Sequence, residues 1–233
     1  MAAARRFRTK PNASWGGLPR NLGTLVARRA HRDNPAIARA PRIPRIAVHH
    51  GGPIVGIDVE TACPEHGAVC SIGVSVVAAG SVVREKHWYL DPGTRFDPRF
   101  IAIHGITPAM VSGSPRLSEA WPEVLRFVED GVDAARPPRL LERSLVPDPE
   151  PLHVAHNAQF DRLQIERALR SPLPFRLACT VSMSRRAFPQ LERHNLKTVS
   201  SHLRIPLKHH DALSDARACA LIAHRCIAAG AGS

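Results

Sequence analysis

The sequence predicts an α/β domain in which a mixed five-stranded sheet is flanked by helices. Three apolar, β-branched segments follow one another closely between residues 54 and 90, and helical and strand-like segments then alternate to the end of the chain. Neighbouring strands with short connections favour an antiparallel meander, and the later alternation favours helices packed against the same sheet. The roughly 175 residues from position 54 onward are enough to bury one core.

The first three strands are expected at Ile54–Glu60, Val69–Ala78 and Val82–Leu90, because these segments are apolar and rich in β-branched residues. Gly80 provides a turn between the second and third. The first strand contains two acids, which are unusual inside an otherwise apolar run.

A helix is expected at Ser118–Asp130, where apolar residues recur at helical spacing after a possible N-cap, Ser118. Residues 131–151 contain five prolines and are interpreted as a loop insertion. The remaining expected elements are a strand at Leu152–Ala155, a helix at Gln159–Arg170 with Phe160, Leu163, Ile165 and Leu169 on one face, a strand at Leu177–Val181, and helices at Leu196–Leu203 and Ala212–Ala229.

Most of the net charge of +12 lies at the N-terminus, where residues 1–50 hold eleven Lys/Arg and one acid. Residues 1–52 are interpreted as a disordered basic tail that precedes a domain at 53–230. Such a tail can attract phosphates without regard to sequence, but a merely solvated extension is the preferred interpretation.

Other bulk features exclude some classes of protein. No apolar run approaches the roughly 18–20 residues of a membrane helix, and no secretory signal is visible. Five cysteines without a Cys-x-x-Cys pair indicate neither a disulfide framework nor a zinc site. Reduced thiols in a cytoplasmic protein are the simplest account.

Three groups of polar residues interrupt the expected core elements. Asp58 and Glu60 are two apart on one strand, so both side chains share a face, and their mutual repulsion requires a basic partner or a metal ion. Asp161 follows a polar turn and falls in the first turn of a helix, where the helix dipole alone can explain an acid. His210 and Asp215 flank the start of the last helix and can reach one site if that helix begins between them.

Together these segments resemble the DEDDh exonuclease superfamily, and most closely the epsilon-type proofreading subunits of bacterial replicative polymerases and their stand-alone relatives. The D-x-E-T strand is similar to residues 56–61 (GIDVET), the second motif to 154–161 (VAHNAQFD), and the H-x-A-L-x-D-A motif to 210–216 (HDALSDA). Shorter similarities are HGIT at 104–107, CTV at 179–181 and HNL at 194–196. The sequence departs from the family pattern at Ala62 and Cys63, beside the terminal-nucleotide region, and at Lys197, where an acid is common.

The resemblance implies a ribonuclease H-like three-layer fold and a two-metal mechanism. It implies that two Mg²⁺ or Mn²⁺ ions are held by Asp58, Glu60, Asp161 and Asp215, and that His210 accepts the proton of the attacking water. The family pattern also suggests substrate contacts by Thr61, His104, His156, Asn157 and Phe160. For His156, a structural role in the turn is an equal alternative.

The implied function is a 3′-to-5′ exonuclease that releases nucleoside 5′-monophosphates from single-stranded DNA. An exoribonuclease or oligoribonuclease shares the same catalytic residues and is the first alternative, and a non-catalytic nucleic-acid-binding module is the second. Single-stranded nucleic acid is the expected partner, with DNA preferred over RNA and no membrane. A proofreading role would require a DNA polymerase subunit acting in trans, because 233 residues leave no room for a polymerase domain.

Overall fold

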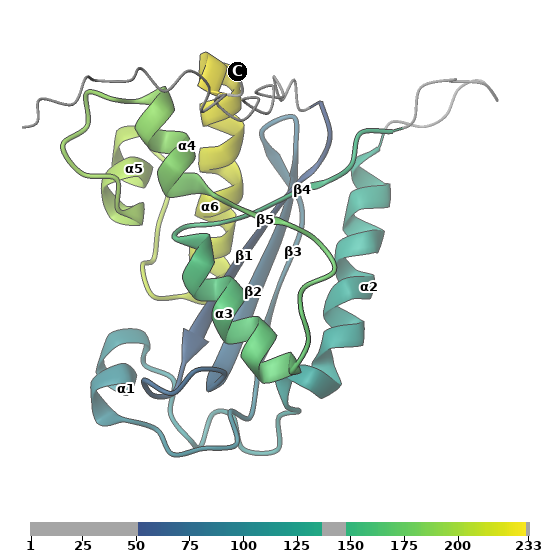
Figure 1. Cartoon of the computed structure of the whole chain (residues 1–233), viewed down its shortest axis with the longest axis vertical. Helices are drawn as coiled ribbons and strands as arrows, with labels where there is room; N and C mark the ends of the chain where they lie inside the picture. The colour runs from purple at the N-terminus through teal and green to yellow at the C-terminus, as the bar shows by residue number, and fades with distance from the viewer. Residues whose placement is uncertain (1–50, 137–147, 232–233) are drawn as a thin grey trace, which may run out of the picture. The chain divides into compact units, whose positions relative to one another are not determined.

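The computed structural model describes residues 51–136 and 148–231, which form a five-stranded sheet surrounded by helices (Figure 1). The strands are β1 (Ile54–Thr61), β2 (Val69–Ala78), β3 (Ser81–Tyr89), β4 (Leu152–Ala155) and β5 (Leu177–Cys179). The helices are α1 (Pro98–His104), α2 (Leu117–Ala135), α3 (Ala158–Leu169), α4 (Thr180–Ala187), α5 (Leu196–His202), α6 (Ala212–Cys226) and a terminal π-helical turn, η1 (Ile227–Ala231).

The sheet has the order β3-β2-β1-β4-β5. Strand β1 pairs antiparallel with β2, and β2 pairs antiparallel with β3, which confirms the expected meander. Strands β4 and β5 then extend the sheet in parallel on the other side of β1. Strand β1 is therefore the central strand, and its two acids lie toward its carboxyl end, beyond the residues that pair with β4.

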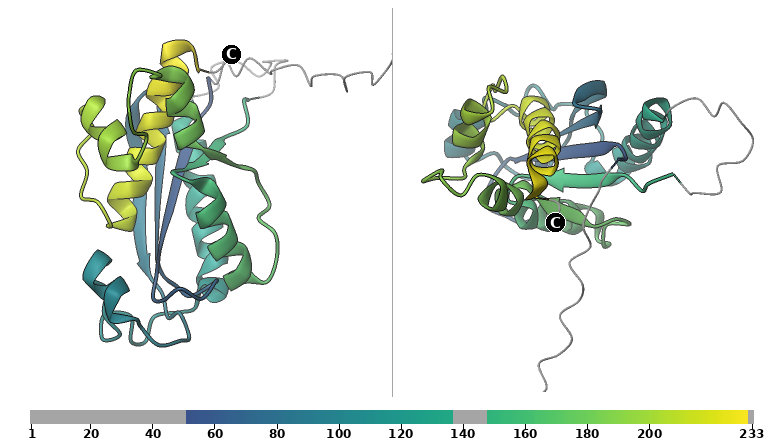
Figure 2. Two further views of the ribbon diagram at one scale, coloured as in Figure 1. Left: turned by 60° about the vertical axis from the view of Figure 1, so that its left-hand side comes forward. Right: turned by 90° about the horizontal axis from the view of Figure 1, so that it is seen from above.

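Helices cover both faces of the sheet (Figure 2). On one face, the buried side chains of α2 pack with Ile165 of α3 against the meander. On the other face, α6 packs against β1 and β2 and forms a second core with residues of α4 and α5. None of the helices in the described ranges is long and apolar enough to cross a membrane.

The helix α2 is longer than the sequence pattern predicts. It begins at Leu117 with Arg116 as its N-cap, so the expectation of Ser118 as the cap is wrong. It also runs through residues 131–135, which were expected to belong to the loop insertion. Val132 is buried, and a side chain at Gly131 would meet Val76, so the glycine permits close packing on the sheet. The helix ends immediately before Pro137, as the steric restriction on a residue preceding proline requires.

Two helices had not been expected. Strand β5 ends at Cys179, and the next two residues begin α4 instead of continuing the strand as predicted. The buried Thr180 hydroxyl lies 3.2 Å from the Ala155 carbonyl, which fixes this transition. Helix α1 has no buried residue, so it has no apolar stripe for a pattern to reveal. Its start is set locally by Asp97, whose carboxylate accepts the Arg99 N–H.

Two glycines allow α6 to lie unusually close to the sheet. A side chain at Gly56 of β1 would place its Cβ 2.0 Å from the Ala216 carbonyl oxygen. One at Gly73 of β2 would place it 2.1 Å from the Ala212 oxygen. Gly73 is the direct partner of Asp58 across the β1–β2 ladder. This contact therefore sets the first turn of α6 beside the acids of β1.

The predicted basic tail lies outside the described residues except for positions 51 and 52, and residues 137–147 of the predicted insertion also lie outside them.

Candidate active site

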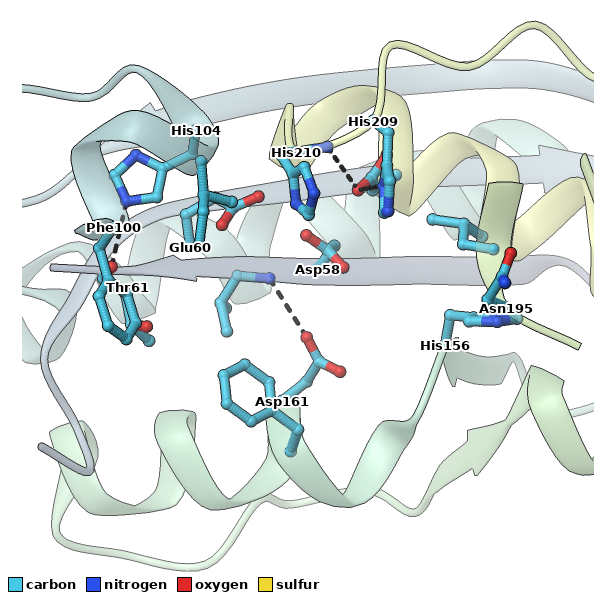
Figure 3. A pocket seen from close by; sticks show the side chains of 15 residues that line it. Asp58, Glu60, Thr61, Phe100, His104, His156, Asp161, Asn195, His209 and His210 are labelled. Atoms are coloured by element: carbon cyan, nitrogen blue, oxygen red, sulfur yellow. Dashed lines mark hydrogen bonds and ion pairs between the residues drawn. The ribbon is translucent and has the colours of Figure 1, made fainter. Parts of the chain in front are cut away.

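A pocket lies at the carboxyl end of β1, where parts of four helices meet (Figure 3). Its walls come from α1, from the first turns of α3, α5 and α6, and from the turn that precedes α6. Predicted site residues from four separate segments are gathered here: the pocket is lined by Asp58, Glu60, Thr61, His104, His156, Phe160, Asp161, His210 and Asp215. Asn157 is exposed at the N-cap of α3 and is not among these lining residues.

Four carboxylates face this pocket from three elements. Asp58 and Glu60 come from β1 and Asp215 from α6, and ligand oxygens of these three lie within 4.8 Å of one another. Asp161, on α3, approaches from the other side of β1, where its Oδ1 accepts a hydrogen bond from the Val59 N–H at 3.3 Å (Figure 3). Asp161 is 2% exposed and is therefore not a surface residue. A favourable interaction with the helix dipole does not by itself explain an acid that is buried in this way.

The carboxylates are electrostatically unfavourable in the absence of a cation. Burial, followed by repulsion from Asp161, Asp215 and Glu60, raises the pKa of Asp58 well above its usual value. Burial and the neighbouring acids raise the pKa of Glu60 to about 8, and burial raises that of Asp161 to about 7. The pKa of Asp215 is also raised, mainly by burial. Such shifts show that the positions disfavour uncompensated negative charge.

The donor set fits hard divalent cations, which prefer carboxylate oxygens. Asp215 shows this most clearly. Its Oδ2 accepts the His210 backbone N–H at 3.1 Å, whereas its buried Oδ1 has no hydrogen-bond partner in the described part of the chain. Buried polar atoms are rarely left unpaired, and a cation at this point would satisfy Oδ1 while offsetting the repulsion.

His210 occupies the turn before α6 and has a left-handed backbone with φ of 65°. Its ring stacks on that of His209 with centroids 3.9 Å apart, and burial lowers its pKa below the usual 6.5. A lowered pKa favours the neutral ring, which can accept a proton. The sequence predicts no role for His209, but in the structure its Nδ1 lies 3.0 Å from Asp215 Oδ2. The only sequence signal for it was its position next to His210.

One end of the pocket combines a fixed imidazole with apolar surface. The Ile106 N–H donates to His104 Nδ1 at 3.0 Å, so the opposite nitrogen carries the proton and donates to the Thr61 carbonyl at 3.1 Å. Beside them the pocket is lined by Phe100, Ile103 and Phe160. The side chain of Phe160 is 43% exposed and that of Ile103 50% exposed, so Phe160 does not face the core as its place in the helix pattern suggested.

The other end of the pocket is formed by His156, Asn195 and Leu196. His156 Nε2 donates to the His194 carbonyl at 2.8 Å, and Nδ1 lies 2.8 Å from the Thr180 hydroxyl oxygen. Burial lowers the pKa of His156 to about 4. With both ring nitrogens engaged inside the protein, the geometry supports the structural interpretation of this residue.

Comparisons with known proteins agree with this arrangement. A family model described as "Exonuclease" matches residues 55–146. The chain is 28% identical over 178 residues to a PolC-type DNA polymerase III of Clostridium perfringens, which covers 72% of the chain but 11% of that protein. It is 28% identical over 164 residues to exodeoxyribonuclease 10 of Escherichia coli, which covers 68% of the chain and 61% of that protein. The chain thus spans less than two thirds of these relatives.

Two solved structures share the fold. One is exonuclease X in complex with 5′-overhanging duplex DNA, with a TM-score of 0.55, 23% identity, and coverage of 75% of this chain and 91% of that one. The other is the nuclease domain of 3′hExo, a DEDDh family member bound to rAMP, with a TM-score of 0.54, 19% identity, and coverage of 76% and 92%. The chain therefore has the ribonuclease H-like fold of these two structures. In sequence, the chain is similar to known exonucleases and to PolC-type polymerases.

Proposed function

We propose that the chain is a metal-dependent 3′-to-5′ exonuclease that removes nucleoside 5′-monophosphates from single-stranded DNA. The observation that carries this proposal is the convergence of Asp58, Glu60 and Asp215 within 4.8 Å, with Asp161 and His210 lining the same pocket. The matches to polymerase III and to exodeoxyribonuclease 10 favour DNA as the substrate.

Two Mg²⁺ or Mn²⁺ ions would be held by Asp58, Glu60, Asp161 and Asp215. When bound, such ions stabilise both the attacking and the leaving oxygen of an in-line displacement at phosphorus. The neutral His210 accepts the proton of the attacking water. Thr61, His104 and the apolar side chains near them hold the terminal nucleoside, and the upstream 3′-oxygen leaves.

RNA is the alternative substrate, since one solved relative of similar fold is described as bound to rAMP and another as recognising a histone mRNA stem-loop. Discrimination would depend on contacts to the terminal 2′ position. The matches to PolC-type DNA polymerase III favour association with a polymerase, and hence a proofreading role.

The test is a gel assay with matched 5′-labelled single-stranded DNA and RNA, in Mg²⁺, in Mn²⁺ and in EDTA. We expect stepwise shortening from the 3′ end that requires metal and is abolished in Asp58→Ala, with DNA degraded faster than RNA. Faster degradation of RNA would replace the DNA assignment by the exoribonuclease. Binding of either strand without metal-dependent shortening would favour a non-catalytic module.

A further inference from the structure

Positive charge in the folded body is concentrated in one stretch of the chain. Residues 170–210 hold eight Lys/Arg and a single acid, Glu192. Residues 51–169 and 211–233 hold thirteen Lys/Arg and eighteen Asp/Glu, so they carry a net negative charge. The basic residues of the stretch are Arg170, Arg176, Arg185, Arg186, Arg193, Lys197, Arg204 and Lys208. Arg193 and Lys197, which are close in sequence to the pocket-lining Asn195 and Leu196, are called here the basic surface.

These basic side chains are exposed and largely without acidic partners. All eight residues are exposed to solvent. Within residues 51–136 and 148–231, an acidic oxygen within 4.0 Å is found only for Lys208, which lies 3.1 Å from Asp211. Arg193 and Lys197 therefore remain available to an external polyanion, to which they would contribute counterion release as well as direct attraction.

The basic surface reaches the pocket at its Asn195 end. Arg193 and Lys197 flank Asn195 and Leu196, which line the pocket at the end opposite Thr61 and His104, and the carboxylates lie between the two ends (Figure 3). An exonuclease leaves one nucleotide on one side of the scissile phosphate and the whole remaining strand on the other. Only the remaining strand carries further phosphates that positive side chains can bind, so we place that strand on the Asn195 side.

The segment that carries Arg193 and Lys197 is held firmly by neighbouring elements. The His194 carbonyl accepts a hydrogen bond from His156 at 2.8 Å, and His194 Nδ1 lies 3.1 Å from the Ser184 hydroxyl oxygen of α4. Asn195 caps α5 by accepting the Thr198 N–H at 2.8 Å. The backbone beneath both basic side chains is therefore positioned before a ligand arrives, which lowers the entropic cost of binding.

We propose that the basic surface, formed by Arg193 and Lys197, binds the phosphodiester backbone of the single strand upstream of the scissile bond. This inference rests on the proposed function, because it assigns the direction in which the substrate leaves the same site. Recognition is of phosphate and independent of base sequence, and the ligand is a strand of several nucleotides.

The test compares Arg193→Gln/Lys197→Gln with the parent, using the full chain in an Asp58→Asn background in EDTA, so that the ligand is not cleaved. The probe is a fluorescent 12-nucleotide single strand titrated at several salt concentrations. Loss of two phosphate contacts should reduce the slope of log affinity against log salt by about 1.4 and weaken binding at 0.1 M salt by about one order of magnitude. Arg126→Gln, an exposed charge on α2, is the control and should change the slope little.

Cleavage assays in the active chain separate this inference from the function on which it rests. The double variant should cleave a 12-mer with a raised KM, and a dinucleotide with unchanged kcat/KM. An unchanged salt slope, or an equal loss for Arg126→Gln, would overturn the inference. So would an equal loss on the dinucleotide, which would indicate damage at the site. If the parent binds the strand but does not cleave it, the proposed function is wrong. The salt titration then still tests whether the basic surface binds the strand.

Discussion

His210 shows at the scale of one residue how backbone conformation and chemistry are linked. A non-glycine residue with positive φ is uncommon and needs support from its surroundings. Here the backbone N–H of His210 donates to Asp215 Oδ2 at 3.1 Å, so the acid helps to hold the turn that presents the imidazole. The proposed base and a proposed metal ligand are thus positioned by each other.

Replacing His210 by alanine should lower kcat by about 10²- to 10⁴-fold, because the attacking water loses its proton acceptor. Mg²⁺ binding should persist, since the carboxylates and the backbone N–H that contacts Asp215 remain. Steady-state kinetics together with metal titration by calorimetry would measure both effects. Loss of metal binding in this variant would show that the general-base assignment is wrong.

His153 makes the stability of the folded protein depend on pH. Its ring stacks on Phe175 with centroids 3.8 Å apart, and burial lowers its pKa to about 4. Between pH 6.5 and pH 4, His153 is protonated in the unfolded chain but remains neutral in the folded chain. The free energy of unfolding is therefore unaffected by this residue above pH 6.5 and falls as the pH drops below that value. A shift of this size corresponds to at most about 3 kcal/mol.

The variant His153→Phe keeps the stacked ring and removes the titrating group. The free energy of unfolding should therefore fall less between pH 7 and pH 5 in the variant than in the parent, by about 2 kcal/mol. Urea denaturation of both proteins in EDTA at the two pH values tests this. An identical pH dependence in the two proteins would show that His153 titrates normally in the folded state.

The sequence was most informative about site residues that lie in contiguous motifs. Asp58 and Glu60 were recognisable because two acids interrupt a buried strand, and His210 and Asp215 because they flank a helix start. Phe100 and Ile103 escaped notice because they lie on a helix that buries nothing, where apolar residues follow no periodic pattern. Their proximity to Phe160 depends on tertiary packing, which local sequence does not encode.

At the scale of secondary-structure elements, the contact between α6 and the sheet is decisive for the site. Gly56 and Gly73 leave room for the backbone of α6, and this brings Asp215 to Asp58 and Glu60. Strands with clear apolar patterns could be predicted to within about a residue, as β1 and β2 show. Helix α4 could not be predicted, because its first residues read equally well as the end of β5.

Substituting Gly73 by alanine should therefore damage both stability and catalysis. Its Cβ would meet the Ala212 backbone at 2.1 Å, and a helix backbone cannot yield cheaply. We expect destabilisation of about 3 kcal/mol from overpacking, with reduced kcat because Asp215 moves with α6. Urea denaturation and kinetics measure the two effects. Gly51→Ala is the control, since a Cβ there meets nothing within 4 Å; equal behaviour of the two variants would contradict the proposed role of the contact.

At the scale of the whole molecule, the distribution of charge matters more than its total. Beyond residue 50, the segment 170–210 is basic and the remainder is negatively charged, while residues 1–50 carry eleven of the 32 Lys/Arg. Composition alone located the N-terminal charge. It could not show that Arg193 and Lys197 flank residues that line the catalytic pocket, because that depends on how α5 and α6 are packed.

Deleting residues 1–50 should weaken binding of single-stranded nucleic acid and flatten its salt dependence, because most of the net charge is removed. Turnover of a dinucleotide should be unaffected, since every proposed catalytic residue lies beyond position 57. Fluorescence titration across a range of salt concentrations, beside a dinucleotide cleavage assay, tests both statements. Unchanged salt dependence would assign the tail no part in nucleic-acid binding.

The close seating of α6 on β1 and β2 also bears on how the protein responds to its metal supply. A divalent cation bound among the acids would act as a cross-link between β1, α3 and α6, three segments far apart in the chain. Without it, repulsion favours brief opening of the first turn of α6. The amide hydrogens of that turn should therefore exchange with solvent more slowly when Mg²⁺ is present. The bound metal would then stabilise the fold in addition to taking part in the reaction.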